Sequence, residues 1–141
     1  MSDSNAPAIR AIVAGHGDWA AGLVSALAQI TGRGDLFLPL TNRGMSGEQL
    51  EMALRAAVDE TGASCVFTDL VGGSWTLTAR RVMRDRPSLV LVTGANLSML
   101  LDFTFHDSMP PEEAARLAVE KGRSAMTVGG GGMQTGGGRG N

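Results

Sequence analysis

The sequence predicts one α/β domain, a three-layer, doubly wound fold in which helices cover both faces of a mainly parallel sheet. Short apolar runs alternate four times with stretches whose apolar residues recur at helical spacing, which is typical of strand–helix–strand units. The runs are apolar throughout, as in strands that are buried on both faces. A length of 141 residues suits a single domain of this kind.

The four apolar runs predict strands over residues 8–14, 36–40, 64–68 and 89–92. We expect the strand order 2-1-3-4, which puts the first and third strands side by side where the winding direction switches. Residues 124–128 have two interpretations, an antiparallel edge strand or an extension of the last helix.

Helices are expected between and after these strands, and local signals mark several of their ends. Ser46, with Gln49 three residues later, forms a capping box before the second helix. The fourth helix is expected over residues 96–105. Pro111 opens the last helix, and Gly122 is expected to end it.

The domain is expected to span residues 8–128, after a flexible N-terminus of residues 1–7. Eight of the 20 glycines fall in residues 129–141, where Met133 is the one large apolar residue. Such a stretch buries too little apolar surface to offset its ordering entropy, so we expect a disordered, glycine-rich tail.

Composition argues against several classes of function. Twelve basic and 14 acidic residues give a formal net charge of -2, which argues against nucleic-acid binding. Cys65 is the one cysteine, so no intrachain disulfide forms, and its apolar neighbours indicate a buried, inert thiol. No metal or cofactor site is indicated. Without a signal peptide, or an apolar run near the roughly 20 residues of a membrane span, a cytoplasmic location is expected.

A histidine and a carboxylate follow the first and third strands. His16 lies between two glycines after the first strand, and Asp69 follows the third. Because the carboxyl ends of parallel strands meet at one edge of the sheet, the expected strand order lets His16 and Asp69 face each other. A carboxylate that accepts a hydrogen bond from one imidazole nitrogen leaves the lone pair of the other available as a nucleophile.

The residues after Asp69 predict a place for a phosphoryl group. Gly72, Gly73 and Ser74 precede a helix, and the N–H groups at a helix start, with the Ser74 hydroxyl, can bind an anion. With His16 as nucleophile, the site predicts a phosphohistidine intermediate and onward transfer. The same residue types also serve as turn residues and helix caps, so spacing alone leaves a purely structural interpretation open.

Two further polar residues receive a structural interpretation. Asp18 is expected to cap the first helix. His106, which is followed by Asp107, is expected in a loop away from the strand ends. Neither is given a chemical role.

Three motifs resemble those of one family, the IIA components of the bacterial phosphotransferase system of the mannose/fructose/sorbose type. Residues 12–20 resemble the family's phosphorylation-site segment. Residues 68–74 resemble its second motif, an acidic residue followed by a Gly-Gly-Ser/Thr turn, and residues 92–100 resemble its third, Gly-x-Asn-x-x-x-Leu. The second and third motifs are most similar to the N-acetylgalactosamine and galactosamine branch.

The resemblance implies a role for each candidate residue. His16 would accept a phosphoryl group from the phosphocarrier HPr and pass it to a IIB component, Asp69 would orient His16, and Gly72, Gly73 and Ser74 would bind the phosphoryl group. Such proteins are usually homodimers and serve the membrane subunits IIC and IID indirectly. The implied chemistry needs no metal and no cofactor.

One departure from the family and three alternatives stay open. The family commonly has proline and an aromatic residue where this chain has Trp75 and Thr76. The main alternative is a regulatory phosphohistidine protein of the same fold that serves no dedicated transporter. The phosphoryl-donor subunit of a dihydroxyacetone kinase shares the fold but typically differs after its Asp. A receiver domain is disfavoured because the first strand lacks the acidic pair that holds magnesium.

Overall fold

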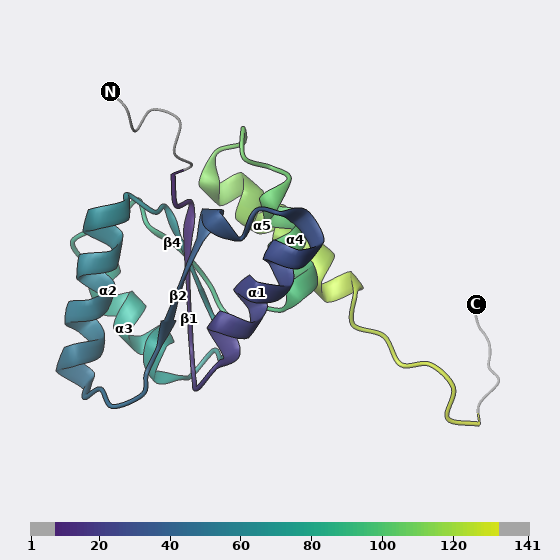
Figure 1. Cartoon of the computed structure of the whole chain (residues 1–141), viewed down its shortest axis with the longest axis horizontal. Coiled ribbons are helices and arrows are strands. Elements are labelled where there is room, and N and C mark those ends of the chain that lie inside the picture. The colour runs from purple at the N-terminus through teal and green to yellow at the C-terminus, as the bar shows by residue number, and fades with distance from the viewer. Residues whose placement is uncertain (1–7, 133–141) are drawn as a thin grey trace.

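Residues 8–132 are described in the computed structural model, and they form a sheet with helices on both faces (Figure 1). The sheet has four strands in the order β2-β1-β3-β4, and all neighbouring strands are parallel. The strands are β1 (Ala11–Gly15), β2 (Phe37–Thr41), β3 (Cys65–Thr68) and β4 (Val90–Val92). The predicted fold class and strand order are confirmed.

The helices form two layers around the sheet. One face is covered by α2 (Gly47–Thr61) and α3 (Ser74–Met83), and the other by α1 (Trp19–Thr31), α4 (Leu97–Thr104) and α5 (Pro111–Ser124) (Figure 1). A short 3-10 helix, η2 (Gly34–Leu36), leads into β2. Successive residues of β1 point to opposite faces, so Val13 packs in the core of the α1–α4–α5 side and Ile12 in the core of the α2–α3 side.

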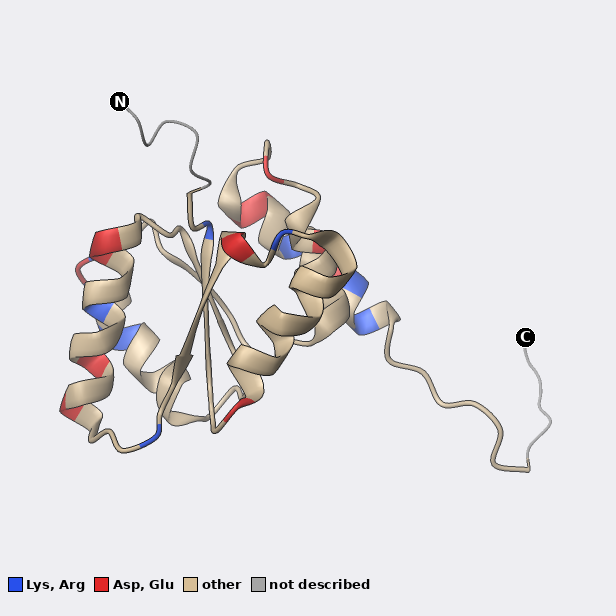
Figure 2. Ribbon diagram, viewed as in Figure 1, with Lys and Arg blue, Asp and Glu red and all other residues tan. Residues whose placement is uncertain are grey.

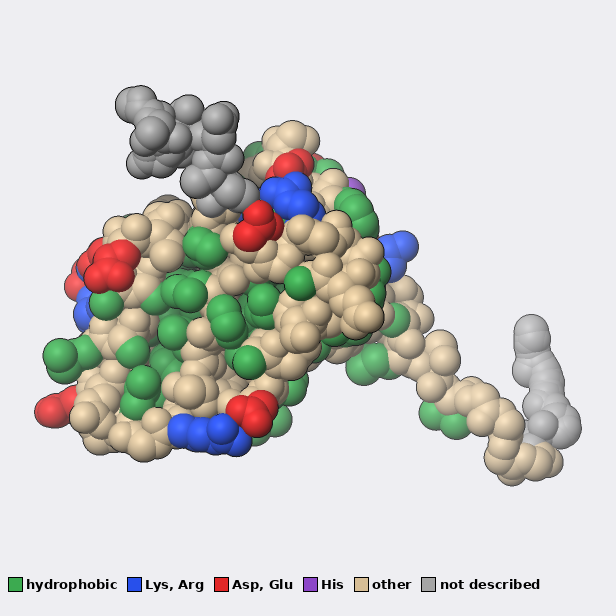
Figure 3. Space-filling view, in the orientation of Figure 1, with side chains coloured by type: hydrophobic (Ala, Val, Ile, Leu, Met, Phe, Trp, Pro, Cys, Tyr) green, Lys and Arg blue, Asp and Glu red, His purple; other side chains and the backbone are tan. Residues whose placement is uncertain are grey.

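The surface is mixed in charge and carries one apolar area in the view shown. Acidic and basic residues are interspersed over the helices (Figure 2). Hydrophobic side chains gather over the edge strand β2, between α1 and α2 (Figure 3). Pro39 lies in β2, as expected of a residue that has no N–H to donate and so suits an edge strand. Within residues 8–132, no helix combines the length and the apolarity that crossing a membrane requires.

The capping box marks the start of α2 as expected, whereas Gly122 does not end α5. The capping box is present, with the Ser46 side chain accepting from the Gln49 N–H. Helix α5, however, runs past Gly122 to Ser124, so the expected stop is wrong. A Cβ atom on Gly122 would lie 3.0 Å from Cε of Met99, so this glycine lets α5 pack closely on α4 instead of ending the helix.

Residues 125–128 adopt neither of the two expected structures. Helix α5 ends at Ser124, and the next residues are in neither a helix nor a strand. An edge strand needs a neighbour with which to share hydrogen bonds, and β4 has β3 as its one partner within residues 8–132. The expectations for residues 1–7, and those for residues 133–141 of the tail, lie outside the described residues.

Candidate functional site

His16 and Asp69 meet at the carboxyl end of the sheet, as the strand order predicts. Strands β1 and β3 pair with Ala14 beside Thr68, so both strands deliver their following residues to the same place. Oδ2 of Asp69 lies 2.8 Å from Nδ1 of His16 and also accepts a 2.9 Å hydrogen bond from the His16 backbone N–H. The His16 side chain is 46% exposed and that of Asp69 12%, so a partner can reach the imidazole while the carboxylate is sheltered.

The charge of Asp69 decides which ring nitrogen of His16 carries the proton. Burial alone would raise the pKa of Asp69, but hydrogen bonds from the ring and the backbone N–H of His16 outweigh burial and hold this pKa below its ordinary value. An ionised carboxylate only accepts hydrogen bonds, so Nδ1 donates. Nε2 then has a free lone pair, which is the state in which histidine acts as a nucleophile.

The start of α3 lies beside the His16 ring. A Cβ atom on Gly73 would be 3.5 Å from Cε1, the ring atom between the two nitrogens. Gly73 is the N-cap of α3, and the first intrahelical bond runs from the Leu77 N–H to the Gly73 carbonyl. The N–H groups of the first three helical residues therefore have no acceptor within the helix. An anion on Nε2 would lie near these N–H groups and near the positive end of the helix dipole.

The three predicted phosphoryl-binding residues differ in where the turn places them. Gly73 lies beside the His16 ring, and its N–H donates to the Leu70 carbonyl over 3.3 Å. Ser74 begins α3, and the helix start has no side-chain cap. Gly72 is exposed, and a Cβ atom there would meet nothing within 4 Å.

The end of β2 and the loop after it also belong to the site, and the sequence analysis did not include them. The Asn42 side chain accepts a 3.2 Å hydrogen bond from the Gly17 N–H, and the Thr41 hydroxyl donates to the Gly17 carbonyl over 2.8 Å. Gly17 has a φ of +58°, which glycine adopts without strain. Strand β2 is the other neighbour of β1, so the residues that follow β2 lie at the same edge of the sheet as His16. The predicted strand order could therefore have identified them.

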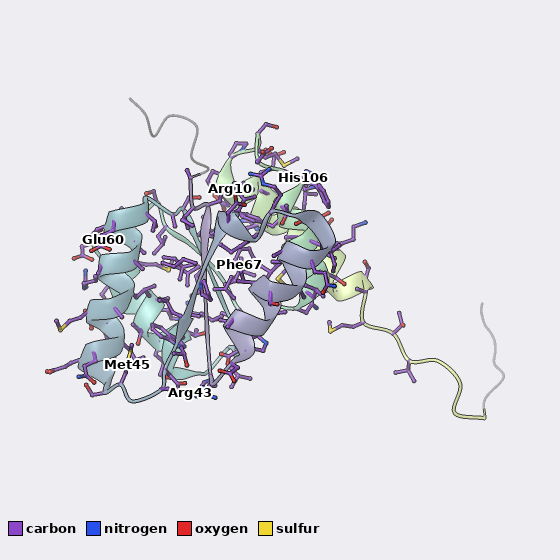
Figure 4. All side chains as sticks on the ribbon, viewed as in Figure 1. Arg10, Arg43, Met45, Glu60, Phe67 and His106 are labelled. Carbon is purple, nitrogen blue, oxygen red and sulfur yellow. The ribbon has the colours of Figure 1, made fainter. Side chains whose placement is uncertain are left out.

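Asp18 stands at the N-cap position of α1 as expected, but its side chain does not cap the helix. Its side chain makes no capping hydrogen bond and instead accepts one of 2.8 Å from Arg43, which follows β2. Figure 4 shows Arg43 at the opposite end of the sheet from Arg10 and His106. The guanidinium donates a charge-assisted hydrogen bond to the carboxylate, which would otherwise accept from a backbone N–H at the helix start. The pair therefore ties the loop after β2 to the turn that carries His16, and its two opposite charges cancel.

His106 and Cys65 lie outside the candidate site. His106 follows α4, with Nε2 3.5 Å from Oδ2 of Asp102, and its carbonyl accepts from Arg10 at the far end of the sheet. Cys65 is buried as expected, and this burial raises the pKa of its thiol to about 11. No cluster of three or more His, Cys, Asp or Glu side chains suited to a metal ion occurs between residues 8 and 132.

Solved structures of three bacterial proteins have the same fold. A phosphotransferase system component EIIA from Streptococcus agalactiae is 22% identical, with a TM-score of 0.77 over 84% of this chain and 95% of that chain. The mannose/sorbose-specific IIA subunit from Enterococcus faecalis is 24% identical, with a TM-score of 0.72 over 89% and 98%. The PTS IIA protein associated with the fucose utilization operon of Streptococcus pneumoniae is also 24% identical, with a TM-score of 0.70 over 84% and 91%.

The family itself is shown by the sequence match. No curated protein matches the chain. The model of one family, described as the PTS system fructose IIA component, matches residues 10–119, a range that contains His16 and Asp69. This range covers most of the chain and includes every strand of the sheet. The chain therefore belongs to the fructose/mannose family of phosphotransferase-system IIA components.

Proposed function

We propose that the protein accepts a phosphoryl group from phospho-HPr on Nε2 of His16 and passes it to a IIB component of a sugar phosphotransferase system. The observation that carries this proposal is the hydrogen bond between Nδ1 of His16 and Oδ2 of Asp69, which leaves Nε2 with a free lone pair on a half-exposed ring. Membership of the IIA family supports a role in sugar phosphotransfer.

The proposed transfer takes place in two in-line steps. In the first, the Nε2 lone pair forms a bond to the phosphorus of the donor phosphohistidine, the donor P–N bond breaks, and its electron pair returns to the donor ring. The His16 ring keeps its Nδ1 proton and becomes positively charged, and the Asp69 carboxylate stabilises this charge. In the second step, a nucleophile of the IIB component takes the phosphoryl group, and the Nε2–P electron pair returns to His16.

We assign binding of the phosphoryl oxygens to the turn and helix start formed by Gly72, Gly73 and Ser74. The dipole of α3 and the N–H groups of its first turn favour an anion at this position. The Ser74 hydroxyl adds a donor at the first residue of the helix. Such preorganised donors stabilise the charge of a transferring group without reorientation during the reaction.

The proposal is tested by incubating the protein with purified phospho-HPr and measuring its intact mass at neutral pH. We expect a gain of one phosphoryl group that is labile in acid and stable in base. The gain should be absent in His16→Ala and unchanged in the matched variant His106→Ala. A gain that persists in His16→Ala, or disappears in His106→Ala, contradicts the assignment. Onward transfer to a IIB component then separates the transport role from the regulatory alternative, in which no IIB component accepts the group.

We further propose that the active form is a homodimer joined at β4. A groove of about 1150 Å³ runs along this edge strand and is lined by residues of β4 and α5. After α5, Met126 and Val128 expose 67% and 97% of their surface, with the alternate spacing of a strand. We therefore assign the groove to this segment of a second copy. Light scattering should give a dimer for the full chain and a monomer after truncation at residue 124.

The cellular location of the protein and the class of transported sugar are part of the same proposal. HPr and the IIB component act in the cytoplasm, so we place the protein there. The motifs at residues 68–74 and 92–100 favour an amino sugar of the N-acetylgalactosamine type as the transported substrate. Because the membrane subunits IIC and IID select the sugar, this chain would act on it only through the IIB component. Comparing onward transfer to IIB components of amino-sugar and mannose systems tests the assignment.

A further inference from the structure

Thr76 makes hydrogen bonds to both chain neighbours of Asp69. Its Oγ1 lies 2.6 Å from Oγ1 of Thr68, and it donates to the Leu70 carbonyl over 2.5 Å. A hydroxyl has one proton to donate, so Thr76 gives its proton to Leu70 and accepts that of Thr68. Thr68 directly precedes Asp69 and Leu70 directly follows it, so one buried hydroxyl holds the side chain of the residue before the carboxylate and the backbone of the residue after it.

Of the two chain neighbours of Asp69, Thr68 is also held through a 2.9 Å hydrogen bond from the Ala95 N–H to its carbonyl, whereas Leu70 depends on the turn itself. The side chains of Leu70 and Val71 are 56% and 70% exposed, so they contribute little packing. The Gly73 N–H also donates to the Leu70 carbonyl, but over 3.3 Å. In contrast, Thr68 and Thr76 are fully buried. In the protein interior a hydrogen bond is stronger than in water, and an unpaired hydroxyl lowers the stability of the fold.

We propose that Thr76 is a positioning residue for phosphoryl transfer: its hydroxyl fixes the turn from Asp69 to Gly73 and thereby keeps Oδ2 of Asp69 on Nδ1 of His16. This inference rests on the proposed role of His16 as phosphoryl acceptor. Thr76 also stands where the family commonly has an aromatic residue. The hydrogen bonds of Thr76 are therefore a property of this chain and are not carried over from the family.

The proposal is tested in the full chain with Thr76→Val, which keeps the shape of the side chain and removes its hydroxyl. Nitrogen NMR of the His16 ring measures the fraction of molecules in which Nδ1 carries the proton that is donated to Asp69. We expect this fraction to fall in Thr76→Val. The single-turnover rate of transfer from phospho-HPr should fall by about ten- to a hundredfold, because a small displacement of a reacting group slows a reaction by that order. Thr76→Ser keeps a hydroxyl and should restore both readouts.

Thr104→Val is the matched control. Thr104 is a buried threonine, 5% exposed, whose hydroxyl donates to the Leu100 carbonyl over 2.8 Å within α4 on the other face of the sheet. It should change the thermal midpoint without changing the His16 spectrum. If Thr76→Val does not fold, Thr68→Val carries the test, because it removes the proton that Thr76 accepts; a smaller shift of the His16 ring in the same direction is then expected.

The two readouts separate this inference from the proposed function. An unchanged His16 spectrum in folded Thr76→Val, or in folded Thr68→Val where Thr76→Val does not fold, overturns the positioning role whatever the transfer rate. A wild-type protein that fails to accept phosphoryl groups overturns the proposed function. A His16 spectrum that depends on Thr76 would still support the positioning role of Thr76.

Discussion

A single oxygen of Asp69 binds His16 twice, once at the backbone N–H and once at ring Nδ1. The other carboxylate oxygen is buried and has no hydrogen-bond partner within residues 8–132. Because one acceptor holds both the backbone and the ring of the same residue, it fixes the side-chain rotamer of His16 together with its tautomer.

Asp69→Asn should slow phosphoryl transfer and leave the fold intact. The amide has a similar shape but no charge, so it cannot stabilise the positive ring that forms on phosphorylation. If its NH₂ group faces Nδ1, the ring proton moves to Nε2 and the nucleophile is lost. We expect a rate reduced by roughly 10²- to 10⁴-fold, as for a comparable orienting carboxylate. Transfer at the wild-type rate by a folded Asp69→Asn protein would show that the carboxylate has no part in the chemistry.

Gly73→Ala should narrow the space beside the His16 ring. The new Cβ atom would lie 3.5 Å from Cε1 of His16 and 3.2 Å from Cβ of Leu70, while the backbone φ of -78° suits alanine. We expect a folded protein that accepts phosphoryl groups about tenfold more slowly. Gly72→Ala is the control because its Cβ atom would meet nothing within 4 Å, so its rate should exceed that of Gly73→Ala. Equal rates for the two variants would argue against a phosphoryl group beside Gly73.

The stability that Asp69 contributes should be lost in acid. Its pKa is held below the ordinary value of about 3.9, so the contribution is complete above that pH and disappears as pH falls through the lower folded-state pKa. Asp59 and Asp85 also have lowered pKa values through hydrogen bonds with arginines, so the wild-type curve alone is ambiguous. The difference in unfolding free energy between wild type and Asp69→Asn isolates the effect. This difference should shrink as the pH falls below about 4; a difference that grows below about pH 4 would contradict the sign of the shift.

Transfer from phospho-HPr should proceed unchanged in excess EDTA. Asp69 is already engaged with His16, and a carboxylate bound to magnesium would be a poorer acceptor for the ring N–H. The N–H groups at the start of α3 can meet the charge of a single phosphoryl group. The assay starts from phospho-HPr freed of enzyme I, which itself needs magnesium. A rate that collapses with EDTA and recovers with magnesium would contradict this mechanism.

Much of the fold and the pairing at the site could be predicted from the sequence because they follow from local patterns. The capping box of Ser46 and Gln49 is determined within four residues, and apolar runs identify the strands. Parallel strands in the order 2-1-3-4 then bring the residues after β1 and β3 together, which places His16 beside Asp69.

The missed features depend on contacts between segments far apart in the chain. Asp18 has the sequence of a helix cap, yet Arg43 reaches it from the loop after β2. Gly122 has the sequence of a helix stop, yet the close approach of α4 favours a glycine inside α5. Thr76 reads as an ordinary helical residue, and its role is visible only once the end of β3 lies against α3. In each case the partner is set by tertiary packing, which local spacing does not encode.

The burial of Cys65 at the start of β3 makes its thiol a built-in reporter of core opening. With the thiol pKa raised to about 11, about one thiol in ten thousand is ionised at pH 7, and the core between the sheet and α5 shields it from reagents. Alkylation of Cys65 therefore proceeds through molecules in which this core has opened. Because β3 also delivers Asp69 to the site, the labelling rate measures in each variant how often the packing around this strand is lost, without denaturant and with no added probe residue.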